Sequence, residues 1–365
     1  MKLKSWKNLR SYRRGMQMSW INETGPARDV VLSSRTRIAR NVANIPFPSI
    51  MKPEHGEQVA QKIRSCFSNN TSLEEPRFNF MYMRDVPAVE RQILVERHLA
   101  SQDLMENIKV SALLLDTKEK VTVMINEEDH IRMQCILPGL QLNQAWEVLS
   151  KVDDVIEEQV EYAFHEKLGY LTCCPTNVGT GLRSSVMMHL PALTMNKQMN
   201  VILQTISKIG LTARGIYGEG SEALGSIYQI SNQITLGPSE DDIISNLTIA
   251  CKQIIDKERF ARKALYKTSG IQFDDAVWRS IGILQNARVL EIKEFMALIS
   301  QIRLGVSLGL VSAFTLEKID GLMTIGQPAG IVKKSGKSAD ASEIDIIRAD
   351  VIRETMKEKI LTKEG

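Results

Sequence analysis

The sequence predicts an α+β protein in which a domain of mixed strands and helices is followed by an all-helical domain. Three observations support this fold class. Alternating apolar residues, typical of strands, recur up to residue 235. Amphipathic helical patterns lie between them. Beyond Gly237-Pro238-Ser239 the strand pattern stops and only helical patterns follow.

Length and composition agree with this class. A chain of 365 residues is long enough for two domains, since one domain has roughly 100–200 residues. Hydrophobic residues make up 43% and charged residues 24%, which excludes a disordered or fibrous protein. The net charge of +3 is too small to indicate nucleic-acid binding. Apolar runs such as residues 112–115 are far shorter than the roughly 20 residues that span a bilayer.

The cysteines and the N-terminal stretch indicate the compartment. The first 28 residues are basic but lack the apolar core of a signal peptide. The cysteines are odd in number, lack metal-ligand spacing and favour a reducing compartment; they are Cys66, Cys135, Cys173, Cys174 and Cys251. We therefore expect a cytoplasmic protein that contacts neither membrane nor nucleic acid directly.

Each element of the first domain follows from its own pattern. After the basic lead-in at residues 1–28, residues 30–39 alternate as a strand does. Apolar residues at helical spacing predict two helices, at 54–69 and 87–100. A polar turn joins two strands into a hairpin at 110–125. The remaining expected elements are a long amphipathic helix at 141–168, a strand at 181–190, a helix at 194–209 and strands at 211–216 and 227–235.

The second domain is expected to contain only helices. Their predicted ranges are 240–267, 274–287, 291–310 and 343–361, with a polar linker before the last one. We place the boundary between Glu258 and Arg259. The catalytic candidate is then residues 29–258, and the helical domain is residues 259–365.

Polar residues recur with a period of two on two predicted strands. If residues 121–133 form one straight strand, Asn126, Glu128, His130 and Arg132 share one face. In the earlier strand Ser33, Arg35 and Arg37 share a face for the same reason. Two arginines so placed form a double fork that suits phosphate oxygens. Taken singly, each face is more typical of a solvated strand surface.

Two glycine-rich segments add further candidates. Gly179 and Gly181 flank Thr180 and would let backbone N–H groups approach an anion, although a Walker loop is absent. Cys174 is either a structural thiol or a thiolate stabilised by arginines. The glycines of residues 214–222 predict a mobile loop that carries Glu219 over a substrate, or an exposed hairpin turn.

Together these segments resemble the guanidino (phosphagen) kinase family. The resemblance lies in residues 31–41 (VLSSRTRIARN), 126–132 (NEEDHIR), 174–191 (CPTNVGTGLRSSVMMHLP) and 214–237 (RGIYGEGSEALGSIYQISNQITLG), in family order. It implies a guanidino-kinase catalytic domain, an antiparallel sheet flanked by helices. Phosphagen kinases carry a helical domain with a specificity loop before the first arginine strand, and a histidine where this chain has Met187. The chain is more similar to the bacterial branch that phosphorylates arginine side chains of proteins.

The resemblance also implies roles for individual residues. Glu128 and Glu219 would hold the acceptor guanidinium, with Cys174 as the reactive cysteine beside it. The cofactors would be ATP and Mg²⁺, without a metal site built by the protein alone. The ATP phosphates would be bound by Arg35, Arg37, Arg132, Arg183 and Arg214. Phosphoryl transfer needs such positioning and charge neutralisation, and a carboxylate can take the guanidinium proton.

Partners and regulation are implied by the resemblance alone. They are protein substrates with exposed arginine, a second copy of the chain bound through the helical domain, a zinc-binding activator, a heat-shock repressor and a Clp unfoldase, in a stress response that marks proteins for degradation. Asp345 and Arg348 partly match a phosphoarginine-binding motif, although Ile344 replaces its first arginine. The alternative is an amphipathic dimer helix with Ile344, Ile347 and Val351 on one side.

Two other functions stay open. One is a phosphagen-type kinase of free arginine, which the missing specificity-loop domain disfavours. The other is a non-catalytic adaptor that binds arginine or phosphoarginine. Retention of the full arginine and acid set disfavours the adaptor, because a binding module has no use for all of it.

Overall fold

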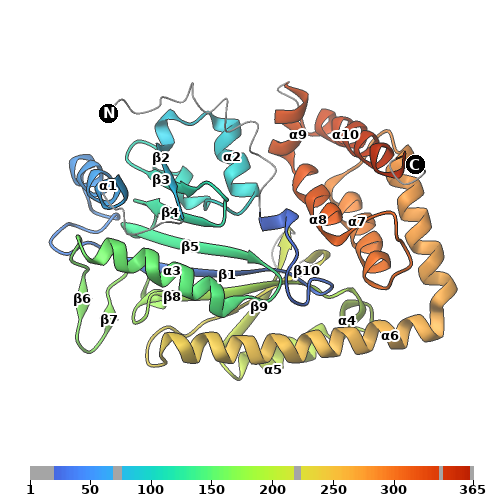
Figure 1. Ribbon diagram of the computed structural model, residues 1–365, viewed down its shortest axis with the longest axis horizontal. Coiled ribbons are helices and arrows are strands. Elements are labelled where there is room, and N and C mark those ends of the chain that lie inside the picture. Colours follow the sequence, from blue (N-terminus) through green and yellow to red (C-terminus); the bar gives the residue numbers. More distant parts are fainter. Residues whose placement is uncertain (1–19, 69–75, 218–222, 337–339, 362–365) are drawn as a thin grey trace.

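One eight-stranded antiparallel sheet forms the centre of the fold (Figure 1). The computed structural model describes residues 20–68, 76–217, 223–336 and 340–361. The strand order is β2-β3-β4-β5-β1-β8-β10-β9, and every neighbouring pair is antiparallel. The strands are β1 (Val31–Arg40), β2 (Phe78–Tyr82), β3 (Ala112–Asp116), β4 (Val121–Ile125), β5 (Ile131–Pro138), β8 (Leu182–His189), β9 (Leu211–Tyr217) and β10 (Ala223–Asn232). A separate hairpin pairs β6 (Phe164–His165) with β7 (Gly169–Tyr170).

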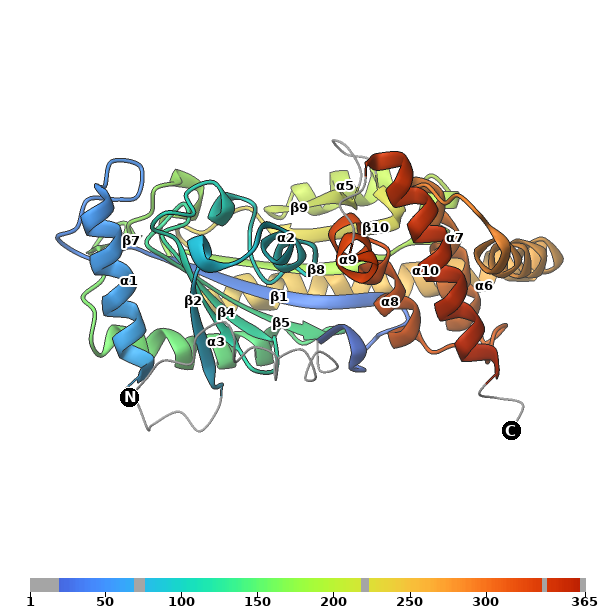
Figure 2. The same cartoon turned by 90° about the horizontal axis from the view of Figure 1, so that it is seen from above.

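Helices cover one face of the sheet and continue into a helical part beside it (Figures 1 and 2). The helices are α1 (Pro53–Ser68), α2 (Ala88–Glu96), α3 (Leu142–Glu157), α4 (Pro191–Met195), α5 (Met199–Ser207), α6 (Glu240–Asn286), α7 (Ile292–Ser307), α8 (Leu316–Ile325), α9 (Pro328–Ser335) and α10 (Ala341–Leu361). Within the part of the chain that the structure describes, no helix has the length and apolarity to cross a membrane.

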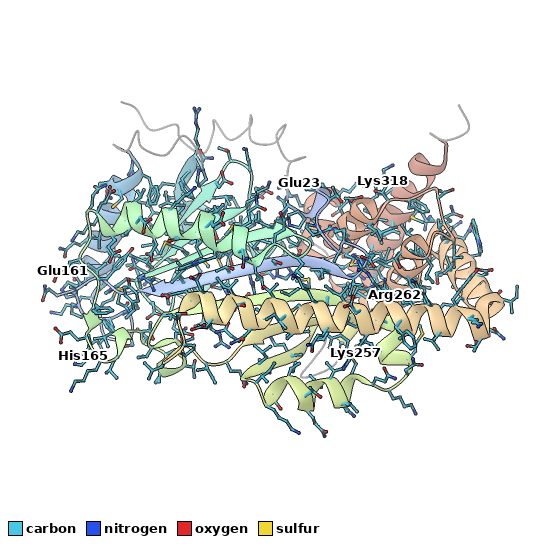
Figure 3. All side chains as sticks on the ribbon, turned by 60° about the horizontal axis from the view of Figure 1, so that its bottom comes forward. Glu23, Glu161, His165, Lys257, Arg262 and Lys318 are labelled. Carbon is cyan, nitrogen blue, oxygen red and sulfur yellow. The ribbon has the colours of Figure 1, made fainter. Side chains whose placement is uncertain are left out.

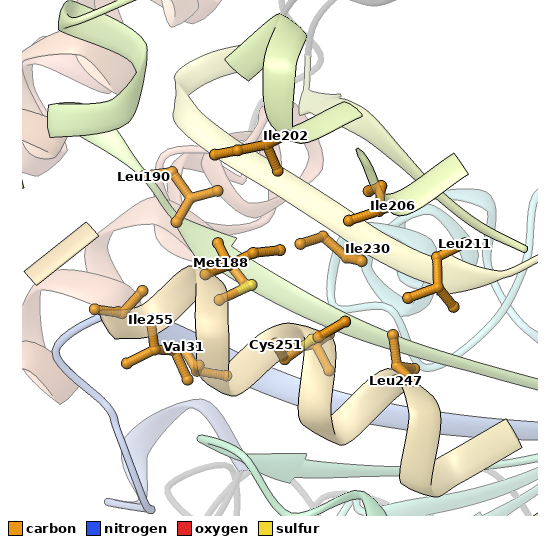
Figure 4. Close-up of a cluster of buried hydrophobic side chains, with 14 of the residues drawn as sticks. Val31, Met188, Leu190, Ile202, Ile206, Leu211, Ile230, Leu247, Cys251 and Ile255 are labelled. Atoms are coloured by element: carbon orange, nitrogen blue, oxygen red, sulfur yellow. The ribbon is translucent and has the colours of Figure 1, made fainter. Parts of the chain in front are cut away.

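Alternation along the strands decides which face is covered. Ile38 on β1 lies opposite Leu182 on β8, so both side chains point to the same side. Ile38 belongs to the core under α3, and Leu182 belongs to the core under α5 and α6. Figure 4 shows that second core, in which Met188 and Ile230 of the sheet meet Cys251 of α6. The opposite face of the sheet packs on other helices at its two ends, through Leu113 and Leu115 of β3 and through Ile227 of β10, and carries polar side chains between them.

The helical part packs directly on the sheet. Phe295, Ile299 and Ile302 of α7 share a core with Ile227 of β10. The sequence predicted two helices at 240–267 and 274–287, but α6 runs through both ranges and is broken only at Ser269, which has φ −138° and ψ 34°. The proposed domain boundary between residues 258 and 259 falls inside this helix, and the division into domains stays a prediction.

Buried ion pairs close the junction between the sheet and the helical part. Arg303 of α7 donates to Asp320 of α8 at 2.8 Å and to the backbone oxygen of Asp29 at 2.9 Å. Arg262 of α6, labelled in Figure 3, donates to Glu258 at 2.7 Å and to the His189 oxygen at the end of β8 at 3.0 Å. These side chains satisfy one another away from water, so the two parts form one packed unit here.

Other element predictions were wrong in extent. The helix expected at 141–168 ends at Glu157, and the chain then forms the β6–β7 hairpin. The helix expected at 194–209 is interrupted at Lys197, whose φ of +56° is left-handed, and it becomes α4 and α5. Strand β2 and helices α8 and α9 were not predicted. Tertiary contacts, rather than the periodicity of the sequence, set the limits of these elements.

Candidate active site

Strand register brings four of the predicted arginines onto the open face of the sheet. Arg37 on β1 lies opposite Arg183 on β8 and opposite Gln134 on β5. Directly paired residues of antiparallel strands point to the same side. Arg35 is two residues before Arg37, and Arg132 is two residues before Gln134, so both share that side. The predicted face of β1 is confirmed in this respect.

The fifth arginine reaches the same face through two further strands. Gln229 on β10 lies opposite Met187 on β8 and opposite Arg214 on β9. Met187 has the same parity as Arg183, so Arg214 also points to the open face. The side-chain amide of Gln229 also accepts a hydrogen bond from Arg35 at 3.1 Å. The five arginines thus form one cluster although they are distant in sequence; they are Arg35, Arg37, Arg132, Arg183 and Arg214.

The cluster carries unsatisfied positive charge. The pKa of Arg37 lies well below its ordinary value because burial disfavours the cation and because Arg35, Arg132, Arg183 and Arg214 repel it. In the described part of the chain, Nε of Arg37 and Nε of Arg183 are buried without a hydrogen-bond partner. Buried donors and mutually repelling cations favour a bound polyanion. The face therefore fits a polyphosphate.

A neighbouring acid, which the sequence reasoning missed, orients one of these arginines. The side chain of Glu127 is fully buried and accepts hydrogen bonds from Arg132 at 2.6 and 2.8 Å. Burial is the largest single influence and would raise the pKa of Glu127, but the charge of Arg132 and the hydrogen bonds from Arg132, Ser101 and the Glu128 N–H together outweigh it, so this pKa is lowered. The available signal was its position beside Glu128 in the acidic run 127–129.

A small pocket next to Arg35 was also missed. The indole Nε1 of Trp20 is buried there without a hydrogen-bond partner among the described residues. Burial, and secondarily Arg35, lowers the pKa of His98 to about 3, so this imidazole is neutral. The lining residues are Trp20, Ser33, Arg35, His98, Ile136, Ser185, Met187 and Gln229. They come from segments far apart in the sequence, and no local pattern marks Trp20 or His98.

The acidic run lies on a turn and not on a strand. The prediction of one straight strand over 121–133 was wrong, because β4 ends at Ile125 and Asn126 adopts φ +57°. Asn126 Nδ2 donates to the backbone oxygens of Gly56 and Val110, which holds this turn in place. Asn126 therefore stabilises the backbone of the turn. Glu128, at the tip of the turn, stays exposed.

Glu128 keeps a carboxylate close to the arginine cluster. Its pKa is raised, chiefly by partial burial, with the neighbouring acids adding to this and Arg132 opposing it. A carboxylate with a raised pKa is a better proton acceptor. His130, predicted on the same face, is instead buried, and its ring nitrogens contact the Val42 N–H and the Pro46 oxygen.

Asp129 links this turn to the cysteine segment. Its Oδ1 accepts hydrogen bonds from the Cys173 N–H at 2.7 Å and from Asn41 Nδ2 at 2.6 Å. Burial first, and then Asp129, raises the pKa of the Cys173 thiol to about 12. Cys174 lies next along the chain, with its sulfur 3.0 Å from Thr176 Oγ1.

Cys174 and Glu128 both lie near Arg183. Each of the two acids raises the pKa of this guanidinium, although burial and the other arginines lower it overall. The structure therefore brings together an exposed carboxylate, a thiol and the edge of the arginine cluster. Such an arrangement can place a cationic acceptor beside a polyphosphate.

The glycines near Thr180 do not form the expected anion cradle. The N–H of Gly179 donates to the Tyr170 oxygen, and the N–H of Thr180 donates to the Thr235 oxygen. A Cβ atom at Gly179, whose φ is +110°, would overlap the Thr235 oxygen. These glycines instead allow close backbone packing under Arg183.

The other predicted residues are not among the described residues of this site. Glu219 lies outside the described residues. Arg348 is buried, donates to the backbone oxygens of Gly326 and Leu290 at 2.7 Å each, and forms an ion pair with Asp345. The two side chains thus satisfy each other and the backbone of the helical part. No group of three or more His, Cys, Asp or Glu side chains that could hold a metal occurs in the described ranges.

Comparisons with known proteins identify the family to which this chain belongs. The model of the "ATP:guanido phosphotransferase, C-terminal catalytic domain" family matches residues 58–261, and that of the "Protein-arginine kinase McsB C-terminal domain" matches residues 270–364. The protein-arginine kinase of Caldanaerobacter subterraneus subsp. tengcongensis is 49% identical over 332 residues, covering 91% of this chain and 98% of that protein. That of Bacillus subtilis is 46% identical over 349 residues, covering 96% of each.

Solved structures of phosphagen kinases share the fold. The crystal structure of lombricine kinase superposes with a TM-score of 0.56 at 25% identity and covers 66% of this chain and 70% of its own. The substrate-free duplicated taurocyamine kinase from Schistosoma mansoni gives a TM-score of 0.54 at 25% identity, covering 66% of this chain and 33% of its own.

Proposed function

The chain belongs to the ATP:guanido phosphotransferase family, and from this premise we propose how its arginine face transfers a phosphoryl group from ATP to arginine side chains of proteins. Its relatives at nearly half identity over more than nine tenths of the chain are protein-arginine kinases. The chain is accordingly a protein-arginine kinase, a phosphotransferase with a guanidino acceptor. The observation that carries the mechanism is the cluster of arginines with unpaired donors beside an exposed carboxylate.

The arginine cluster binds the triphosphate. The buried, unpaired Nε donors of Arg37 and Arg183 can reach phosphate oxygens only if a polyanion enters the cluster. Arg132, fixed by Glu127, adds a donor whose direction is set before binding. Charge neutralisation by a preformed donor set is the main contribution that a protein makes to phosphoryl transfer.

Mg²⁺ fits this site as an ion carried by the nucleotide. It binds few protein ligands and keeps waters, so it needs only phosphate oxygens and at most one or two carboxylates. When bound, Mg²⁺ would neutralise charge on the transferring phosphoryl group.

The acceptor arginine lies between Glu128 and the γ-phosphate. Glu128, with its raised pKa, orients the guanidinium and takes the proton as the N–P bond forms. Glu219 is proposed as the second carboxylate that holds the guanidinium, and Cys174 adds a polar sulfur that faces the cation. A guanidinium has a pKa above roughly 12, so it needs this help to act as a nucleophile.

Acceptor choice separates the main proposal from its alternatives. We expect an arginine within a flexible protein segment to be a better acceptor than free arginine. The test compares kcat/KM for free arginine with kcat/KM for an unstructured peptide with one arginine, with acid-labile phosphate mapped by mass spectrometry. A preference for free arginine would replace this proposal by a phosphagen-type kinase. Arginine binding without phosphorylation of either acceptor would indicate an adaptor.

A homodimer is proposed through the helical part. Beyond Ser269, helix α6 exposes Ile271 and Trp278, whose side chains are 75% and 58% accessible. Large apolar side chains on one helix are typical of protein interfaces. Analytical ultracentrifugation of the parent and of Trp278→Ser tests this, and a parent that sediments as a monomer contradicts it.

Cytoplasmic location, a role in stress response and the named partners remain proposals carried by the family resemblance. The partners are a zinc-binding activator, a heat-shock repressor and a Clp unfoldase. Co-purification from cells before and after heat shock, with the Glu128→Gln variant as control, tests them together.

A further inference from the structure

A buried glutamine contacts one arginine of the cluster and lies opposite another. Gln229 is 6% exposed, and its Oε1 accepts a hydrogen bond from Arg35 Nη2 at 3.1 Å. Its place on β10 also puts it directly opposite Arg214 of β9. One neutral amide therefore lies beside two of the five cations of the cluster.

Arg35 reaches this amide by crossing a whole strand. Strand β8 lies between β1 and β10, so the two backbones are about 10 Å apart across the sheet. The residue of β8 opposite Arg35 is Ser185, which in turn lies opposite Ser231 of β10. Because these two side chains are small, the arginine can extend over β8 to Gln229. The amide therefore sets the direction of Arg35 at its far end.

The surroundings of this contact are neutral. Gln229, His98 and Trp20 help to line the small pocket beside Arg35, and among the described lining residues Arg35 is the charged one. The charge of Arg35 acts on the rest of the cluster, since Arg35 comes first among the cations that lower the pKa of Arg37, after burial. A neutral acceptor at this place fixes the guanidinium without cancelling its charge.

Arg132 is held in the opposite way. Its guanidinium donates to the carboxylate of Glu127 at 2.6 and 2.8 Å, which fixes its direction but offsets part of its charge. A carboxylate in place of the Gln229 amide would lie beside Arg35 and opposite Arg214, and it would compete with phosphate oxygens for both. The amide avoids this competition.

We propose that Gln229 is a positioning residue, which directs Arg35 towards the ATP phosphates and leaves the positive charge of Arg35 available to them. This inference rests on the proposed binding of ATP by the arginine cluster. Gln229 acts through Arg35. A guanidinium whose direction is set before the nucleotide arrives loses less conformational freedom on binding, so the phosphates are bound more tightly and in one orientation.

Two substitutions of Gln229 separate direction from charge. Gln229→Leu removes the acceptor without adding charge, whereas Gln229→Glu keeps the shape and the acceptor but adds a carboxylate beside Arg35. The control Gln204→Glu adds the same charge at an exposed position of α5, which packs on the other face of the sheet. The Kd is measured for ATP and for inorganic tripolyphosphate, which lacks the nucleoside, and differential scanning fluorimetry checks that each variant is folded.

Gln229→Glu should raise the Kd of both ligands about tenfold or more, because its carboxylate pairs with Arg35. Gln229→Leu should raise both only about threefold, as expected for the loss of one hydrogen bond. In an Arg35→Ala background Gln229→Leu should have no effect, because the side chain that Gln229 orients is gone. The control should bind both ligands as the parent does.

A larger loss in Gln229→Leu than in Gln229→Glu would overturn the proposal, since shape and acceptor would then matter more than neutrality. So would weaker binding of ATP with unchanged binding of tripolyphosphate, an effect of Gln229→Leu that persists without Arg35, or an equal loss in the control. If Gln229→Glu does not fold, Gln229→Leu and its combination with Arg35→Ala decide the question. A parent that binds neither ligand would instead show that the proposed binding of ATP is wrong.

Discussion

Replacing Glu127 by glutamine removes the negative charge that faces Arg132 and keeps the side-chain shape. In the parent the carboxylate is fully buried, and both of its oxygens accept from one guanidinium nitrogen at 2.6 and 2.8 Å. After the change, Arg132 keeps at most one neutral acceptor. It then faces the repulsion of Arg37 and Arg183 with only Glu128 and Asp103 as acids that still favour its charge.

The expected loss of stability follows from burial. Removing one partner of a buried ion pair costs about 3–5 kcal/mol. Here glutamine still accepts one hydrogen bond and Arg132 is 15% exposed, so we expect the lower part of this range or slightly less, about 2–3 kcal/mol. At roughly 2 °C per kcal/mol for a long chain, Tm should fall by about 4–6 °C.

Activity should fall as well, because Arg132 is no longer held toward the phosphates. A misplaced donor in a transition-state cluster costs roughly 10- to 100-fold in kcat/KM. The pKa of Glu127 is lowered in the folded protein, so its contribution to stability is complete above its unfolded pKa and is lost as pH falls through the folded pKa. The Tm difference between parent and variant should therefore shrink in acid.

Differential scanning fluorimetry across pH and steady-state kinetics with ATP measure both effects. The control is Asp275→Asn, which removes a partner 3.9 Å from Arg279, where the side chains are 68% and 72% exposed. An exposed pair of this kind contributes little, so Tm of the control should stay within about 1 °C. A Glu127→Gln protein with parental Tm and parental kcat/KM would refute the view that this acid orients Arg132.

Three other changes probe the site. Glu128→Gln should keep the fold and ATP binding but lose roughly 10²–10⁴-fold in kcat; its raised pKa also predicts that parental activity falls in acid at a pH above the ordinary value of 4.5, and a variant within a few-fold of the parent would demote Glu128 to a surface residue. Arg35→Lys should be nearly as damaging as Arg35→Ala, because lysine lacks the planar fork, and full activity of the lysine variant would contradict this. Iodoacetamide should modify Cys174 before Cys173, whose thiol pKa is about 12, and ATP with an arginine peptide should slow it; peptide mapping that finds Cys173 modified first would contradict this.

The sequence by itself determined the fold class and supplied the candidate site residues. Arg35 and Arg37 share a face because strands have a period of two, and β1 confirms this. The end of strand patterns after residue 237 correctly separated the sheet from the helices that follow. Such inferences succeed because they depend on residues close together in the chain.

Tertiary structure alone decided how these residues meet. The positions of Arg132, Arg183 and Arg214 in one cluster depend on the register of five neighbouring strands, which periodicity does not report. The turn that exposes Glu128 depends on Asn126, which is held by the Gly56 and Val110 oxygens. Neither the cluster nor the turn can be inferred from the periodicity of a single predicted strand.

The same reason explains the residues that were missed. Trp20 and His98 become part of the site only when the segments before β1 and after α2 close over Arg35. Arg348 resembled a ligand-binding residue until its partners were known, and those partners are backbone oxygens at Gly326 and Leu290. A sequence records which chemical groups a chain carries. Which of them remain unpaired, and therefore free to bind a ligand, depends on long-range packing that satisfies some buried groups and leaves others, such as Nε of Arg37, without a partner in the described structure.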